Sequence, residues 1–403
     1  MDFDDTPDEA AWRTRVREYL VEHRDQLGDR STGRNDVPAS KTAQACLYDG
    51  GFVGVTWPKE FGGQAGTPMQ QAIVDQEMAR LAVPPPINLI GIGMCGPTVI
   101  AHGSDEQKQR YLTRLLRAED IWCQLFSEPA SGSDLAALRT KAVRGEDGDW
   151  RITGQKVWTT GAHYADFGIL LTRTNPDVPK HKGLTMFVVD MHAPGVTVRP
   201  LRQMSGGSDF NEVFFDDVVI PDGERLGEVD NGWRVALTTL MSERLSLGGG
   251  GTDIGTGIDS LITHAAQHIS TLSPERQALA RHDLGRAYVA SLGIRYTGYR
   301  MLSAISKGAP PGPEASAGKL AGTVAARAMA DLAVRLLGDD AVYAKTADGA
   351  GTWQHLQAVL PGMAIAGGTD QVLKNVLGER VLGLPTEPRA DKGTPVRSTG
   401  GKQ

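Results

Sequence analysis

Cysteine is scarce in this sequence, and no apolar run is long enough to cross a bilayer. Cys46, Cys95 and Cys123 are the only three cysteines in 403 residues, and they are far apart. They form neither a disulfide framework nor a metal-ligand spacing. About 20 successive apolar residues would be needed for a membrane span. The acidic first residues lack the positive segment and apolar core of a signal peptide. We therefore expect reduced thiols, no metal site, no membrane span and a cytoplasmic protein.

Positive charge is not in excess either. Lysine and arginine number 42 against 48 aspartate and glutamate residues, which gives a net charge of −6. Both signs are interspersed, so the sequence has no basic stripe for nucleic acid, and no nucleic-acid partner is expected. The hydrophobic fraction of 40% and the charged fraction of 22% are those of an ordinary globular protein. The length predicts two or three domains.

The periodicity of apolar residues changes twice along the chain. Residues 1–120 have helical spacing, residues 121–231 form β-rich runs separated by Gly, Pro and Asp, and residues 232–388 are helical again. The expected strands are 149–160, 167–172, 184–190, 196–201 and 212–219. Residues 389–403 are charged and poor in large apolar side chains, which predicts a disordered tail. This order indicates an α+β fold with a β domain between two helical domains.

Two segments of the β block carry a distinctive pattern. Residues 124–134 read Gln-Leu-Phe-Ser-Glu-Pro-Ala-Ser-Gly-Ser-Asp, and residues 154–162 read Gly-Gln-Lys-Val-Trp-Thr-Thr-Gly-Ala. Taken separately, the first is typical of a polar surface turn and Trp158 of a core position in a strand. Gly132 would let another group approach the backbone closely.

Together, the two segments resemble the signatures of the acyl-CoA dehydrogenase family, here of an actinobacterial type. The resemblance covers residues 40–385 approximately. It implies the acyl-CoA dehydrogenase fold, with an N-terminal helical domain, a middle β-barrel-like domain and a C-terminal four-helix bundle. It also implies FAD as cofactor, α,β-dehydrogenation of an acyl-CoA or carrier-bound acyl thioester, and an electron-transfer flavoprotein as acceptor.

The resemblance further implies roles for individual residues. Those expected to bind the cofactor are Gln124, Phe126, Ser127, Gly132, Ser133, Trp158, Thr159, Thr160, Thr369 and Gln371. Those expected to contact the substrate are Ser133, Arg244, Ala366 and Gly367.

The usual catalytic base is missing. Most of the family has Glu-Gly-Thr where this chain has Gly367-Gly368-Thr369, and glycine cannot accept a proton. Glu243, directly before Arg244, resembles the position from which a minority of the family supplies its base. An apolar surrounding would raise the pKa of this carboxyl towards the working range. A structural Glu-Arg pair on an exposed helix face is the alternative interpretation.

Small residues near these positions suggest room for a bulky or branched acyl group. Ala366 and Gly367 replace larger side chains of many relatives, and residues 248–251 are all glycine. Close helix packing is the competing explanation.

The assembly expected from the sequence is a homodimer, a tetramer or a heteromer with a related subunit. Arg335-Leu336-Leu337-Gly338-Asp339 stands where many members have Gln-x-x-Gly-Gly, a segment that completes the neighbour's FAD site. An aspartate close to a pyrophosphate would repel it. Two alternatives to an independent dehydrogenase follow: a non-catalytic or half-site partner subunit, and an oxygen-using flavin oxidase or monooxygenase on the same fold.

Overall fold

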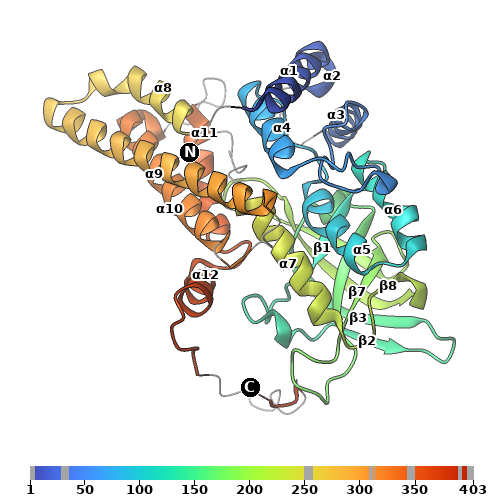
Figure 1. The fold of residues 1–403 in the computed structure, drawn as a ribbon. Coiled ribbons are helices and arrows are strands. Elements are labelled where there is room, and N and C mark those ends of the chain that lie inside the picture. The colour runs from blue at the N-terminus through green and yellow to red at the C-terminus, as the bar shows by residue number, and fades with distance from the viewer. Residues whose placement is uncertain are drawn as a thin grey trace. The chain divides into compact units, whose positions relative to one another are not determined.

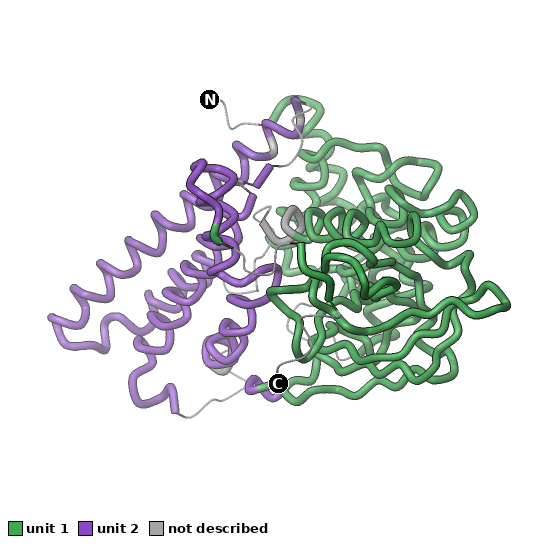
Figure 2. Tube along the Cα trace, turned by 90° about the horizontal axis from the view of Figure 1, so that it is seen from below, with its two compact units in different colours: residues 1–203, 207–243, 387–403 green, residues 204–206, 244–386 purple. Residues whose placement is uncertain are grey.

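The computed structural model describes residues 5–28, 36–248, 257–307, 312–313, 315–342, 350–388 and 393–396. The chain divides into two compact units (Figure 2). The first comprises residues 1–203, 207–243 and 387–403, and the second comprises residues 204–206 and 244–386. Most of the expected disordered tail, and the glycines 249–251, lie outside the described residues.

Three helices of the first unit begin at capping boxes. They are α1 (Pro7–Glu22), α4 (Pro68–Arg80) and α6 (Asp105–Leu116). The hydroxyls of Thr6, Thr67 and Ser104 each accept a hydrogen bond from the N–H three residues later, where a Glu or Gln reaches back. The remaining helices are α2 (Arg24–Leu27), α3 (Val37–Asp49), a π-helical turn Gly91–Cys95, α5 (Gly96–His102) and the part of α7 (Gly232–Gly248) up to residue 243.

The first unit also contains one eight-stranded sheet (Figure 1). Its strands are β1 (Trp122–Leu125), β2 (Lys141–Arg144), β3 (Trp150–Thr160), β4 (Phe167–Arg173), β5 (Leu184–Asp190), β6 (Val196–Leu201), β7 (Phe210–Ile220) and β8 (Arg225–Leu226). Their order is β6-β7-β3-β2-β4-β5-β8, with β1 paired in parallel to β4. The five strands expected from the sequence are thus confirmed as β3 to β7.

Alternating side chains give the sheet two apolar faces. Ile169 and Leu171 of β4 join the core that includes the helices, whereas Leu170 between them joins a second core made almost entirely by the sheet. In β5, Met186 joins the core that includes the helices, and Phe187 joins the second core. This two-residue period follows from the pleat and explains why β4 and β5 read as continuous apolar runs.

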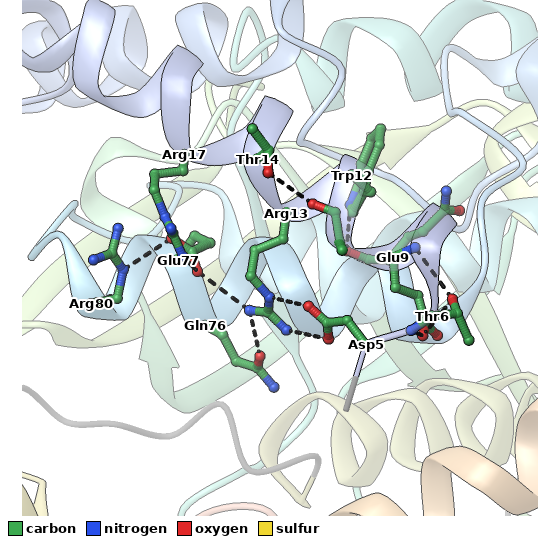
Figure 3. A network of polar contacts seen from close by, with 12 residues as sticks. Asp5, Thr6, Glu9, Trp12, Arg13, Thr14, Arg17, Gln76, Glu77 and Arg80 are labelled. Carbon is green, nitrogen blue, oxygen red and sulfur yellow. Dashed lines mark hydrogen bonds and ion pairs between the residues drawn. The ribbon is translucent and has the colours of Figure 1, made fainter. Parts of the chain in front are cut away.

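A buried carboxylate ties α1 to α4 in the first unit (Figure 3). Glu77 of α4 has a side chain only 3% exposed, and its oxygens accept hydrogen bonds from Arg13 at 3.3 Å and Arg17 at 2.9 Å on α1. Arg80 adds a third bond at 3.0 Å, and Asp5 holds the other side of the Arg13 guanidinium at 2.6 Å. Burial by itself raises the pKa of Glu77, but the three arginines outweigh burial and lower it from 4.5 to about 2.

Acid should therefore weaken the first unit through Glu77. Its pKa is lower in the folded than in the unfolded chain, so the contribution is present above pH 4.5 and is lost as pH falls through about 2. A shift of this size corresponds to about 3 kcal/mol of unfolding free energy at neutral pH. Urea unfolding should show Glu77→Gln less stable than wild type at pH 7, with the difference shrinking below pH 4.5. Glu60→Gln, at an exposed position, should match wild type throughout. A pH-independent difference would contradict the account.

The second unit is helical. Its helices are α8 (Ile258–His268), α9 (Pro274–Ser306), α10 (Ala315–Leu337), α11 (Ala350–Met363) and α12 (Asp370–Val376). A core of small and aliphatic side chains joins α8, α9, α10 and α11. Arg335 of α10, which replaces a family glutamine, is paired at 2.8 Å with Asp283 of α9.

Two expectations about composition can be compared with the structure. Cys46, Cys95 and Cys123 are free and buried, as expected. Across the described parts of the chain, no helix has the length and apolar character that crossing a membrane requires.

Candidate functional site

The first predicted cofactor segment is a tight turn after β1. The backbone N–H of Glu128 donates to the Ser131 carbonyl and that of Ser131 to the Glu128 carbonyl, both at 3.0 Å. Gly132 and Ser133 follow and are exposed. Apart from its two chain neighbours, no heavy atom of the described residues lies within 4 Å of the place a Cβ at Gly132 would occupy, so the packing of the described chain does not require a glycine. The turn thus offers Gly132 and Ser133 to a group outside the chain.

The other predicted residues of this segment are less accessible. Gln124 lies in β1 opposite Ile169 of β4 and is half-buried, and Phe126 is buried in the core shared with the helices. The carbonyl of Ser127 accepts a hydrogen bond from the N–H of Val157 at 2.9 Å. The structure therefore brings the two sequence segments, 124–134 and 154–162, into direct contact.

A buried ion pair joins these segments a second time. Lys156 is fully buried, and its Nζ donates to the Glu128 carboxylate at 2.9 Å and to the Phe126 carbonyl at 3.0 Å. The same carboxylate accepts from the backbone N–H groups of Arg139 at 2.7 Å and Thr140 at 2.8 Å. Burial lowers the pKa of Lys156 to about 8, against the opposing pull of Glu128. Burial raises the pKa of Glu128, but the lysine charge and these hydrogen bonds outweigh burial and hold it below its ordinary value.

Trp158 is not a core residue. It is 61% exposed, whereas Trp150 on the same strand is 4% exposed. Its φ is +61°, in the left-handed region that a bulky side chain rarely adopts, and the register between β3 and β7 shifts between Lys156 and Thr159. Such strain is characteristic of functional sites. The bulge turns the indole outward, where its only described ring neighbour is Phe210, edge-on at 6.0 Å.

Thr159 and Thr160 end β3 opposite Asn211 and Phe210 of β7. Thr159 is buried, and its Oγ1 has no hydrogen-bond partner among the described residues. A buried hydroxyl without a partner costs about 1–3 kcal/mol. An outward indole beside an unsatisfied hydroxyl fits a bound aromatic ring with polar edges, which is the chemistry of a flavin.

The candidate base lies on α7. The Thr239 hydroxyl is 2.8 Å from that of Thr98 on α5, and Thr238 Oγ1 is 2.8 Å from His102 Nε2. These two contacts join α7 to α5 within the first unit. Glu243 lies one turn beyond Thr239 on the same face of α7. It is half-buried. The side chain of Arg244 is outside the described part.

The remaining predicted residues belong to the second unit. Gly367 and Gly368 have φ of +67° and +92°, so this turn is shaped for glycine. Lys319 of α10 donates to the Gly368 carbonyl at 3.0 Å. Thr369 caps α12, its Oγ1 accepting from Val372 N–H at 3.1 Å. Ala366 and Gln371 are exposed.

The sequence alone assigned no site role to four polar residues that hold these segments in place. They are Glu128, Lys156, Asn211 and Lys319. Asn211 is buried, and its Nδ2 donates to the Thr159 carbonyl at 2.9 Å. Glu128 and Lys156 lie within the two signatures, Asn211 lies in β7 and Lys319 in α10, and nothing in the sequence pairs Lys156 with Glu128.

Comparisons with known proteins agree on one family. Models of the acyl-CoA dehydrogenase N-terminal, middle and C-terminal domains match residues 6–119, 123–218 and 230–382 in succession. The acyl-CoA dehydrogenase FadE34 of Mycobacterium tuberculosis is 41% identical over 348 residues, which cover 85% of this chain and 46% of that one. The chain thus spans about half the length of that relative.

Two solved structures are similar over almost the whole chain. The ChsE4-ChsE5 complex from Mycobacterium tuberculosis has a TM-score of 0.82 at 28% identity and covers 96% of this chain and 100% of that one. The Tcur3481-Tcur3483 steroid ACAD has a TM-score of 0.81, also at 28% identity, with the same coverage.

Proposed function

This chain belongs to the acyl-CoA dehydrogenase family, and from that premise we propose that it dehydrogenates a bulky, ring-bearing acyl-CoA with Glu243 as the base. The family is FAD-dependent, so the enzyme is a flavoprotein oxidoreductase. FAD, when bound, supplies the two-electron acceptor for the hydrogen that leaves Cβ as hydride. The chain itself must bind the thioester, exclude water and take the proton from Cα.

The position of Glu243 on α7 is the observation that carries the proposal. A glycine at 367 leaves no proton acceptor at the usual family position. Glu243 is half-buried and follows, by one helical turn, the Thr239–Thr98 contact that joins α7 to α5. A carboxylate on this partly buried helix face can accept the α-proton through one of its own electron pairs. The electron pair of the broken Cα–H bond then forms the new Cα–Cβ double bond as the β-hydrogen leaves with its pair as hydride.

The ring-bearing substrate is proposed from side-chain size and from similarity. Ala366 and Gly367 together contribute one methyl group of side chain, which leaves space for a wide acyl group. The similarity to a steroid ACAD over 96% of this chain supports the same class. We therefore propose a steroid-like acyl thioester with several fused rings, with an electron-transfer flavoprotein as electron acceptor and the cytoplasm as the place of action.

A heteromer with a related dehydrogenase subunit is the second part of the proposal. Arg335 is paired with Asp283 of its own unit, and Asp339 follows at the position of a family glycine, so this segment is poorly suited to a neighbour's pyrophosphate. The similar ChsE4-ChsE5 structure is a complex of two named chains. In the relative FadE34, the part that matches this chain makes up 46% of the protein, so more than half of FadE34 lies outside the match.

Anaerobic flavin reduction tests the function directly. The purified chain should be yellow, and its visible flavin band should bleach with ring-bearing acyl-CoAs at a rate about 100-fold above that with butyryl-CoA. Faster bleaching by the short linear thioester would reject the substrate class. A colourless chain, or a yellow one that no acyl-CoA bleaches, would instead favour a half-site partner subunit. Rapid peroxide formation in air would favour an oxidase.

A further inference from the structure

The residues before and after the strained Trp158 are hydrogen-bonded to neighbouring segments. Before it, Lys156 and Val157 are bonded to the turn after β1, through Glu128, the Phe126 carbonyl and the Ser127 carbonyl. After it, the Thr159 carbonyl accepts from the buried amide of Asn211. Trp158 lies between these two attachments.

A left-handed residue with a large side chain persists only where its surroundings impose that conformation. The left-handed region is unfavourable for an ordinary residue relative to its preferred backbone. Trp158 makes few contacts of its own that could offset this cost, since it is 61% exposed. The attachments of its neighbours must therefore maintain the bulge.

Of those attachments, the hydrogen bonds donated by the Lys156 side chain are the strongest, because the donor is charged. This donor is fully buried and binds a carboxylate and a carbonyl of one turn at the same time. Charge-assisted bonds of this kind are roughly twice as strong as neutral ones. The carboxylate is itself fixed by two backbone N–H groups at 2.7 and 2.8 Å, so it is a rigid anchor. Arg173 lies close enough to Glu128 for their charges to interact, and it too is buried.

We propose that Lys156 is a positioning residue of the cofactor site: it holds the turn of residues 126–133 against the end of β3 and thereby keeps Trp158 turned outward to face the ligand. The inference rests on the proposed function only in taking these two segments as the flavin-binding ones. The role proposed for Lys156 and Glu128 is distinct both from contact with the substrate and from general packing of the core.

The test compares FAD binding in a variant that removes both charges of the buried pair with that of wild type. Lys156→Met alone leaves Glu128 buried with an unpaired charge and is expected to destabilise the fold. The double variant Lys156→Met/Glu128→Gln removes both charges, and such neutral replacement of a buried pair is often tolerated. Lys141→Met, at an exposed position of β2, is the matched control.

The readouts are urea unfolding, FAD dissociation constant and the fine structure of the visible flavin band, all without acyl-CoA. A folded double variant should bind FAD at least tenfold more weakly than wild type, and its visible flavin band should lose fine structure. Lys141→Met should equal wild type in both measurements. Wild-type affinity and spectrum in the folded double variant would overturn the proposal. So would a double variant that does not fold, because the pair would then serve the core as a whole, or a wild-type chain that binds no FAD. Failure of acyl-CoA to bleach the wild-type flavin would reject the proposed function and leave this comparison intact.

Discussion

Replacing Glu243 by glutamine should slow flavin reduction by a ring-bearing acyl-CoA about 1,000-fold. General-base catalysis by a positioned side chain contributes roughly 10²–10⁴ in rate, and the amide of glutamine cannot accept the α-proton. The amide keeps the size of the side chain, so the fold and the cofactor segments 124–134 and 154–162, which lie elsewhere in the first unit, should be unaffected. Stopped-flow measurement of flavin bleaching under anaerobic conditions gives the rate directly.

Two further measurements make this result specific. The FAD dissociation constant and the unfolding midpoint of Glu243→Gln should equal those of wild type. Glu228→Gln removes a carboxylate at an exposed position shortly before α7 and should bleach at the wild-type rate. If Glu243→Gln reduced its flavin within a few-fold of wild type, Glu243 would be a structural residue and the base would have to be sought elsewhere.

Placing a glutamate at position 367 should not restore the usual catalytic arrangement. Gly367 has φ of +67° and is followed by Gly368 at +92°, whose carbonyl is held by Lys319. A side chain at 367 would be strained by about 1–2 kcal/mol and would occupy the space that we propose for the acyl rings. We expect Gly367→Glu to lower kcat/KM for a ring-bearing acyl-CoA about 100-fold, a typical effect of a misfit in an apolar pocket.

Gly367→Ala separates the two causes, because alanine carries the backbone strain without the bulk. It should lose a similar amount of stability but much less activity with the ring-bearing substrate. The double variant Gly367→Glu/Glu243→Gln shows whether the new carboxylate can act as base, and we expect it to stay as slow as Glu243→Gln alone. Recovery of butyryl-CoA turnover in that double variant would contradict the account of the turn.

The strands were predictable from the sequence, whereas the extent of one long helix within the predicted helical region was not. Strands β3 to β7 alternate or run apolar between Gly, Pro and Asp, which is a strong local signal. Helix α9 has the reverse pattern: Ala280 and Ala287 are buried, while Leu279 and Val289 are exposed at 54% and 68%. A helix that buries its small residues and exposes its large ones gives no amphipathic pattern, so its 33-residue length was missed. Strands β1 and β8, of four and two residues, are too short for a period.

For the candidate site, the sequence predicted which segments contribute but not how they are held. Trp158 and Thr159 were found through their signature, yet the positive φ of Trp158 depends on a register shift against β7 that only the folded sheet defines. Lys156 could not be recognised as a buried charge, because its partner Glu128 lies 28 positions earlier. Local patterns cannot reveal such long-range pairs. The proposed roles of Glu243, Thr369 and Gln371 remain predictions.

The outward position of Trp158 also gives the protein a built-in optical probe. The chain has seven tryptophans, and the structure describes all of them; the other six are buried or half-buried. A collisional quencher such as acrylamide reaches exposed indoles far more readily than buried ones. The quenchable fraction of the intrinsic fluorescence therefore reports chiefly on one residue, at the bulge of β3. The state of this turn can thus be followed in the native chain without attaching a dye.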